Sequence, residues 1–167
     1  MTIENAIQIC KDTGLNDWEL VAFAQSLVNQ NIKYSITNSF DTPEEAFEKG
    51  KGYCWHQAKV LNKILIDLGF SSRLVHAYKN YFPEVEFEGI VLKDFVTGHL
   101  WCRVTIGTEE KDVCPGNIKN KPGITQFKSL GKVHEWNSRM DLLTYYGAAL
   151  VNFMRGKKYI NNKNLEK

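Results

Sequence analysis

Two stretches of the chain carry apolar residues at helical spacing. The first follows Asn16 and Glu19, which form a candidate capping box, and its apolar stripe consists of Leu20, Phe23, Ala24, Leu27 and Val28. The second runs from about Cys54 to Leu68, and its stripe consists of Ala58, Leu61, Ile64, Leu65 and Leu68. Spacings of three and four residues put each set on one helical face, so both stretches are predicted to be helices. Gly69 marks the end of the second.

Shorter helices are predicted before, between and after these two. Thr2 to Thr13 forms one that ends at Gly14. Another starts at Thr42, with Pro43 at its first position and Glu45 closing a capping box, and it ends at Gly50. A last helix begins at Ser138, with Asp141 at its third position. Its apolar residues are Leu142, Leu143, Tyr146, Ala149, Leu150 and Phe153.

Strict alternation between 100 and 106 predicts a half-buried strand. One face carries Leu100, Cys102, Val104 and Ile106, and the other carries His99, Trp101, Arg103 and Thr105. Residues 107–110 read as a turn, after which 111–114 should return antiparallel before Pro115-Gly116. If the loop has an even number of residues, His99 and Asp112 share a face and can be cross-strand or diagonal neighbours.

The remaining segments complete an α+β pattern, with helices packed on an antiparallel sheet. Residues 70–78 and 86–95 are rich in strand formers, whereas 33–40 is extended or irregular, and 79–86 and 116–131 are predicted loops. Neither a repeat nor a linker interrupts the chain, so residues 1–160 are predicted to be a single domain. Residues 161–167 form a polar tail that we expect to be frayed.

Composition is that of an ordinary globular protein. The 167 residues are 43% hydrophobic and 24% charged, with a net charge of +2. Because the basic residues are scattered, we expect neither a nucleic acid nor a membrane as partner. Residues 1–5 lack the basic and apolar regions of a signal peptide, and no apolar run is long enough to span a membrane. These features predict cytoplasmic residence and leave the oligomeric state open.

Cys54 is the first candidate for chemistry, because it stands in the first turn of a largely buried helix after Gly52-Tyr53. Unpaired N–H groups at a helix start favour a thiolate and can also hold an oxyanion. A buried structural cysteine is the alternative. His99 could lower the pKa of the thiol and accept its proton, and Asp112 could hold the tautomer of the ring. Considered one at a time, each residue also has a non-catalytic interpretation. His99 would be an ordinary, partly exposed strand histidine, and Asp112 a solvated acid close to a turn.

The other cysteines and histidines show no pattern of a metal site. Cys10, Cys102 and Cys114 lack C-x-x-C spacing, and His56, His76 and His134 do not form a zinc ligand set, so neither a metal nor a cofactor is expected. His56 should point away from Cys54, as a surface or packing residue. Cys102 and Cys114 belong to opposite sheet faces and should not form a disulfide.

In their order, these motifs resemble the transglutaminase-like superfamily, a branch of the papain-like cysteine enzymes. The motifs are Thr42-Pro43-Glu44-Glu45, Gly52-Tyr53-Cys54-Trp55, the Leu68–Val75 segment, His99-Leu100-Trp101 and Asp112, and they span about residues 41–117. The resemblance implies a papain-like fold with Cys54 as nucleophile, His99 as general base and acid, and Asp112 as the residue that orients His99. Papain-like proteases also place a glutamine upstream of the cysteine. Gln25 and Gln30 lack the expected surroundings, so the Cys54 N–H is the one oxyanion donor assigned.

The resemblance implies a thiol-dependent acyl-transfer enzyme that acts on amide or isopeptide bonds of a peptide, a protein or a small amide. Hydrolysis by a protease or amidase is favoured over crosslinking, because bacterial relatives are more often suspected hydrolases. Four aromatic residues, expected to be exposed, are candidates for substrate binding: Trp55, Trp101, Tyr81 and Phe82. These side chains would suit recognition of a binding partner as well as catalysis. The alternative is therefore a catalytically silent fold that serves as a binding module.

Overall fold

The computed structural model describes residues 1–87, 90–143, 146–147, 149–151 and 153–154. Its helices are α1 (Ile3–Asp12), α2 (Asp17–Asn31), α3 (Pro43–Lys49), α4 (Cys54–Asp67) and α5 (Ser138–Leu143). Its strands are β1 (Lys33–Tyr34), β2 (Lys51–Gly52), β3 (Ser71–Phe82), β4 (Val85–Phe87), β5 (Ile90–Leu92), β6 (Phe95–Ile106), β7 (Glu109–Val113), β8 (Lys128–Ser129) and β9 (His134–Glu135). The predicted tail at 161–167 lies outside the described residues.

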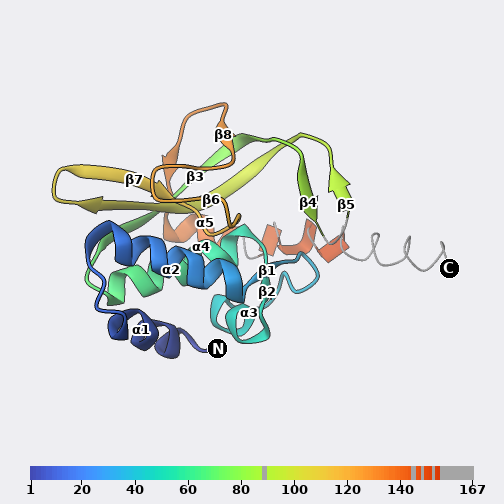
Figure 1. The fold of residues 1–167 in the computed structure, drawn as a ribbon. Helices are drawn as coiled ribbons and strands as arrows, with labels where there is room; N and C mark the ends of the chain where they lie inside the picture. Colours follow the sequence, from blue (N-terminus) through green and yellow to red (C-terminus); the bar gives the residue numbers. More distant parts are fainter. Residues whose placement is uncertain (88–89, 144–145, 148, 152, 155–167) are drawn as a thin grey trace.

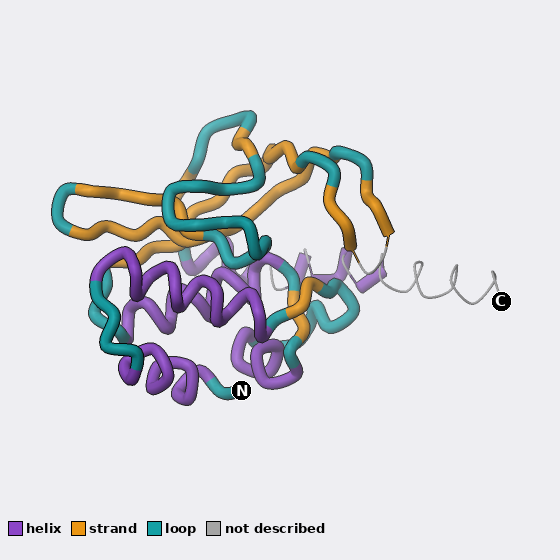
Figure 2. The backbone as a smooth tube through the Cα atoms, in the orientation of Figure 1, coloured by secondary structure: helices purple, strands orange, loops and turns teal. Residues whose placement is uncertain are grey.

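Helices and sheet form two layers, which confirms the α+β prediction. The antiparallel sheet has the order β7-β6-β3-β8, and β9 also pairs with β3. Helices α1 to α4 lie together on one side of this sheet (Figures 1 and 2). The helix that begins with Cys54, α4, packs against both β3 and β6. No helix in the described ranges is long and apolar enough to cross a membrane.

The main core fills the space between the helices and the near face of the sheet. Helix α4 contributes Ala58, Val60, Leu61, Ile64 and Leu65, each completely buried. Strand β6 contributes Leu100, Cys102 and Val104, which are the apolar residues of its predicted alternation. Helix α4 is covered by α1, α2 and α3 as well as by the sheet.

A second, smaller cluster lies on the far face of the sheet. Val75, Ala77, Trp101 and Cys114 are buried there, with Phe127 and Val133 packed against them. The 115–133 segment therefore covers this face. Cys102 and Cys114 fall in different clusters and both are free thiols, as the strand pattern predicts.

Helix caps show where local sequence decides the structure. Thr42 and Glu45 form the predicted capping box, with the Glu45 N–H donating to Thr42 Oγ1 at 3.2 Å and the Thr42 N–H donating to Glu45 Oε2 at 2.8 Å. The predicted box at Asn16 is wrong. Asn16 makes no side-chain cap bond to α2, and its amide Nδ2 instead donates back to the Gly14 carbonyl at 3.4 Å.

The predicted loop at 79–86 is also wrong. Strand β3 continues to Phe82, and β4 starts at Val85. The pairing of β3 with β6 shifts register between Ala77 and Asn80. This irregularity is bridged by Asn80 Nδ2, which donates to the Ala77 carbonyl at 2.8 Å. A bulge lets a strand bend without ending, so β3 extends past the polar residues that suggested a loop.

Candidate active site

Cys54 opens α4, as predicted, and the side chain of His56, two residues later, shapes the helix start. The backbone N–H of Tyr53 donates to His56 Nδ1 at 3.2 Å, while His56 Nε2 lies 2.9 Å from the Asp41 carbonyl. His56 is completely buried, so it is a packing residue with a capping role and not a surface residue. The Gly-x-Cys motif follows from this contact. A Cβ at Gly52 would lie 2.8 Å from His56 Cβ.

Gly52→Ala is therefore expected to displace the turn before Cys54. Overpacking a rigid site of this kind typically costs about 1–3 kcal/mol, which should appear as a lower free energy of unfolding in urea. Gly131→Ala is the matched control, because a Cβ there would meet nothing within 4 Å. Equal stability of the two variants would contradict the proposed contact.

Burial raises the pKa of the Cys54 thiol to about 11. The backbone N–H groups of Leu100, Trp55 and Cys54 act in the opposite direction and lower this pKa by less. The last two groups belong to the start of α4, and the first belongs to the residue that follows His99. The site therefore has donors that could hold an oxyanion, although the Cys54 thiol is neutral at physiological pH. The expected low thiol pKa is not found.

The His99 ring lies in a group of aromatic side chains. Its centroid is 4.7 Å from that of Phe127 and 5.1 Å from that of Phe82, both in edge-on contacts, and 5.9 Å from that of Trp101. Burial among these rings lowers the pKa of His99 to about 3. The imidazole is therefore neutral at physiological pH and can accept a proton from a thiol.

The structure separates His99 from Asp112. The loop between β6 and β7 is Gly107-Thr108, and the register that follows places Asp112 opposite Arg103. Arg103 Nε and Nη2 donate to the two Asp112 oxygens at 2.7 and 3.2 Å. His99 shares the face of Arg103 but lies four residues along β6, about 13 Å away at ~3.3 Å per residue. The predicted contact between Asp112 and His99 is therefore not made.

Cys114 occupies the place expected for Asp112. His99 Nε2 lies 3.2 Å from Cys114 Sγ, and the Gly116 N–H donates to the same sulfur at 3.4 Å. In the described part of the chain this is the one hydrogen bond of the ring, so Nδ1 is left without a hydrogen-bonding partner.

The His99 ring and the first turn of α4 meet at Gly116. A Cβ built there would lie 3.4 Å from Cys114 Sγ, 3.6 Å from Gln57 Oε1 and 3.9 Å from His99 Cε1. Gln57 stands one turn after Cys54, and its Nε2 donates to the Ile32 carbonyl at 3.0 Å. Burial raises the pKa of Cys114 to about 12. No hydrogen bond joins Cys54 to His99 among the described residues.

These pKa values predict how stability depends on pH. The folded state keeps His99 neutral down to about pH 3, whereas an unfolded histidine gains a proton below 6.5, so the free energy of unfolding should fall as pH drops through this window. Folding also raises the thiol pKa of Cys54 to about 11 and of Cys114 to about 12, so stability should fall again above the ordinary value of 9.0. Each such group changes stability by about 1.4 kcal/mol per pH unit. Urea midpoints between pH 4 and 10 should thus be highest from about 6.5 to 9. A maximum outside that window would contradict these shifts.

The four candidate substrate-binding aromatics are not equally accessible. Trp55 is 6% exposed and Trp101 is 1% exposed, so the expectation that these two are exposed is wrong. Trp101 lies in the centre of β6, beneath Phe127. Tyr81 and Phe82 are partly exposed on β3. Phe82 and Trp101 both lie against the His99 ring, and Phe82 is the partly exposed one of the two.

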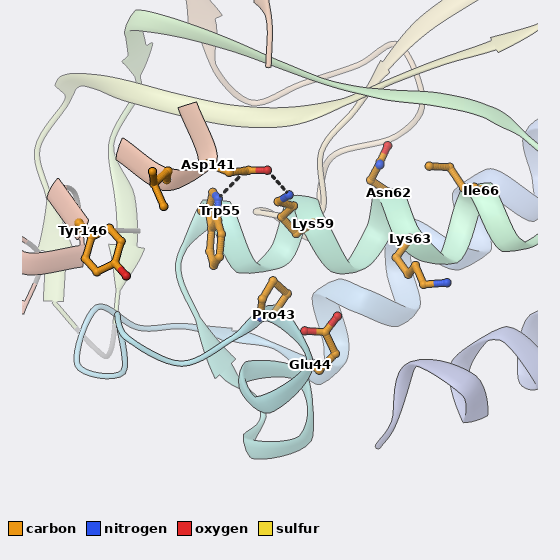
Figure 3. A pocket seen from close by; sticks show the side chains of 10 residues that line it. Pro43, Glu44, Trp55, Lys59, Asn62, Lys63, Ile66, Asp141 and Tyr146 are labelled. Atoms are coloured by element: carbon orange, nitrogen blue, oxygen red, sulfur yellow. Dashed lines mark hydrogen bonds and ion pairs between the residues drawn. The ribbon is translucent and has the colours of Figure 1, made fainter. Parts of the chain in front are cut away.

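Trp55 is fixed by an acid on α5. Its Nε1 donates to Asp141 Oδ1 at 3.4 Å, Lys59 Nζ lies 2.6 Å from Asp141 Oδ2, and Trp136 Nε1 donates to Oδ1 as well. Figure 3 shows Asp141 reaching over α4 to Trp55 and Lys59. A hollow beside this contact is lined by Pro43, Glu44, Trp55, Lys59, Asn62, Lys63, Ile66, Asp141, Leu142 and Tyr146.

Three features of the site were missed by the sequence reasoning. They are Cys114 as the partner of His99, the Leu100 N–H beside Cys54, and Gln57 beside Gly116. The pattern contained one signal for the first, because Cys114 has the same face parity as Asp112. The upstream glutamine Gln25 is buried, and its Nε2 donates to the Cys114 carbonyl at 3.0 Å. The described residues include no cluster of three or more metal-ligating side chains.

Comparison with known proteins agrees with this architecture. The sequence model of the transglutaminase-like superfamily matches residues 8–112, more than half of the chain. The chain belongs to the transglutaminase-like superfamily. Among solved structures, a protein of Cytophaga hutchinsonii described as a putative cysteine protease is similar, with a TM-score of 0.51 and 12% sequence identity. The similarity covers 81% of this chain and 49% of that protein, so this chain spans about half of its length. A search of curated proteins finds no sequence similar to this chain.

Proposed function

We propose that this protein is a cysteine hydrolase that cleaves amide or isopeptide bonds through an acyl-enzyme on Cys54. The observation that carries the proposal is the position of the Cys54 thiol at the start of α4, where the N–H groups of Leu100, Trp55 and Cys54 lower its pKa against the effect of burial. Membership of the superfamily supports a thiol-dependent enzyme. Peptides, proteins and small amides are the proposed substrates, and cytoplasmic residence stays a prediction.

In the proposed reaction His99 acts first as a base. Nδ1, which has no hydrogen-bonding partner in the described structure, accepts the Cys54 proton as the sulfur attacks the carbonyl carbon. The oxyanion that forms is held by backbone N–H groups at the start of α4. The protonated His99 then donates to the leaving amine, the C–N bond breaks, and a thioester remains on Cys54. Because both groups rest in the neutral state, proton transfer and attack are coupled.

Water or a second amine can resolve the thioester. Hydrolysis stands first because it requires no second substrate site. His99 would take a proton from water as the oxygen attacks, and the acid product would leave with Cys54 reprotonated. Amine transfer follows the same steps, with the amine as nucleophile.

The neutral resting pair also supports a second candidate, a catalytically silent binding module. A thiol pKa of about 11 and an imidazole pKa of about 3 give no thiolate at pH 7. In such a protein Cys54 would serve packing, and the half-exposed Phe82 and Tyr81 would serve recognition.

Acylation with an activated p-nitrophenyl ester separates the two candidates. The enzyme should release a burst of one equivalent of nitrophenol and gain the acyl mass on Cys54, followed by hydrolysis. Adding a labelled primary amine then measures transfer against hydrolysis. Fluorogenic peptide and isopeptide amides test the natural bond type. A protein that gives no burst, no acyl mass and no amide cleavage would be a binder.

A further inference from the structure

We propose that the Cys114 thiol is the positioning group for His99, receiving the hydrogen bond of its Nε2–H, and that Asp112 has no part in the site. The inference rests on the proposed function of Cys54 and His99. Cys114 acts through His99, so its role is to hold the ring and not to touch the substrate.

The first support is the direct contact. His99 Nε2 and Cys114 Sγ are 3.2 Å apart, and the Gly116 N–H also approaches this sulfur at 3.4 Å. Because the Gly116 N–H donates to Sγ, we assign Sγ as the acceptor of the hydrogen bond from the ring as well. This assignment puts the ring proton on Nε2 and leaves the Nδ1 lone pair for the Cys54 proton.

The backbone that carries Cys114 is held by side-chain amides from two directions. Gln25 Nε2 of α2 and Asn120 Nδ2 of the following loop both donate to the Cys114 carbonyl, at 3.0 and 2.9 Å. Asn29 Nδ2 of α2 donates to the next carbonyl, that of Pro115, at 2.5 Å. Cys114 is 2% exposed. Buried amides that fix a single residue in this way are the supporting shell that a precise hydrogen bond requires.

Asp112 is excluded by its own ion pair. Both of its oxygens are engaged by Arg103 in a bidentate arrangement on the same strand pair. Moving the carboxylate to His99 would break this pair and the register of the hairpin. The acid that the motif order suggests is therefore occupied elsewhere.

A thiol in this position has a chemical consequence. A neutral sulfur orients the ring without stabilising an imidazolium, whereas a carboxylate does both. The site therefore holds His99 in the productive tautomer but leaves it a weak base. This matches the low His99 pKa, for which burial is the sole cause found.

The test replaces the acceptor with groups of different charge. In Cys114→Asp a carboxylate faces Nε2, and the pKa of His99 should rise to its ordinary value of about 6.5 or above it. Alkylation of Cys54 by iodoacetamide at pH 7 should then be at least tenfold faster than in the native protein, because an imidazolium stabilises the thiolate. In Cys114→Ala the ring should lose its fixed tautomer, and the acylation rate of Cys54 should fall about tenfold, the effect of one lost hydrogen bond. Nitrogen chemical shifts of labelled histidine report the pKa and the tautomer.

Two control variants test the alternative explanations. Cys102→Ala removes a buried thiol from the opposite sheet face, and Asp112→Asn removes the acid suggested by the motif order. Both should leave the His99 pKa and tautomer unchanged. If Cys114→Asp unfolds, the Cys114→Ala variant and the tautomer of His99 in the native protein still test the role of Cys114.

The inference is overturned if native His99 carries its proton on Nδ1. It is also overturned if Asp112→Asn changes the pKa or the tautomer of His99 while the Cys114 variants do not. Absence of any acyl-enzyme would instead refute the proposed function. The nitrogen shifts would still report on Cys114 in that case, so the two failures are distinguishable.

Discussion

Cys54→Ala is expected to lower kcat/KM for amide cleavage by at least about 10³-fold, because no other group at the start of α4 can form the thioester. Removing the nucleophile of a related catalytic set costs about this much or more. His99→Ala should cost about 10²–10⁴-fold, the usual contribution of a general base. The fall in kcat/KM of His99→Ala should be at least as large as in enzymes whose thiol is already ionised, since Cys54 rests as a neutral thiol. Initial rates with a fluorogenic amide provide the measurement.

Cys102→Ala is the matched control for this pair of variants. Cys102 is completely buried in β6, and its Sγ donates to the Ala58 carbonyl at 3.3 Å, away from the site. It should lower stability and leave kcat/KM within a few-fold of the native value. Activity that survives in Cys54→Ala would exclude the acyl-enzyme mechanism.

Alkylation of Cys54 is expected to accelerate by about 10³-fold between pH 7 and pH 10. The thiolate reacts with iodoacetamide, and below a pKa of about 11 its fraction grows tenfold with each pH unit. A thiolate stabilised by a charged histidine would instead react at a rate that levels off below neutral pH. Peptide mapping by mass spectrometry separates Cys54 from the other three thiols. His99→Ala should leave the profile nearly unchanged, because the native imidazole is neutral over this whole range.

The denatured protein supplies the reference for that experiment. Its Cys54 should follow an ordinary thiol curve with a midpoint near 9.0, so the folded protein should react more slowly at pH 8. A plateau for the folded protein below pH 8, lost in His99→Ala, would mean that a thiolate–imidazolium pair exists in solution.

Sequence alone determined the elements whose signals are local. Thr42, Glu45 and Gly50 enclose α3 because a cap, a first-turn acid and a left-handed glycine act within a few residues of one another. The stripe from Ala58 to Leu65 predicts α4, and Cys54 therefore stands at a helix start. The alternation from Leu100 to Ile106 predicts which side of β6 is buried against that helix.

Only the tertiary structure decided which side chain faces His99. Face parity is a property of the strand pattern, and it correctly put Asp112 and Cys114 on the side of His99. Distance along the strand depends on the register, which the Gly107-Thr108 loop and the Arg103–Asp112 pair set together. The sequence reasoning chose Asp112 from face parity and the motif order, and neither of these fixes the distance along the strand.

The same distinction applies to the electrostatics of the site. The order of Cys54, His99 and Asp112 indicates an activated thiol, but pKa values depend on how much water each group loses. Phe82, Trp101 and Phe127 come from three separate segments and surround one imidazole only after folding. Desolvation of this kind is the sum of many contacts between segments that are distant in the sequence. The order of the motifs therefore indicates a thiol-dependent enzyme, whereas the protonation state of the site arises from packing.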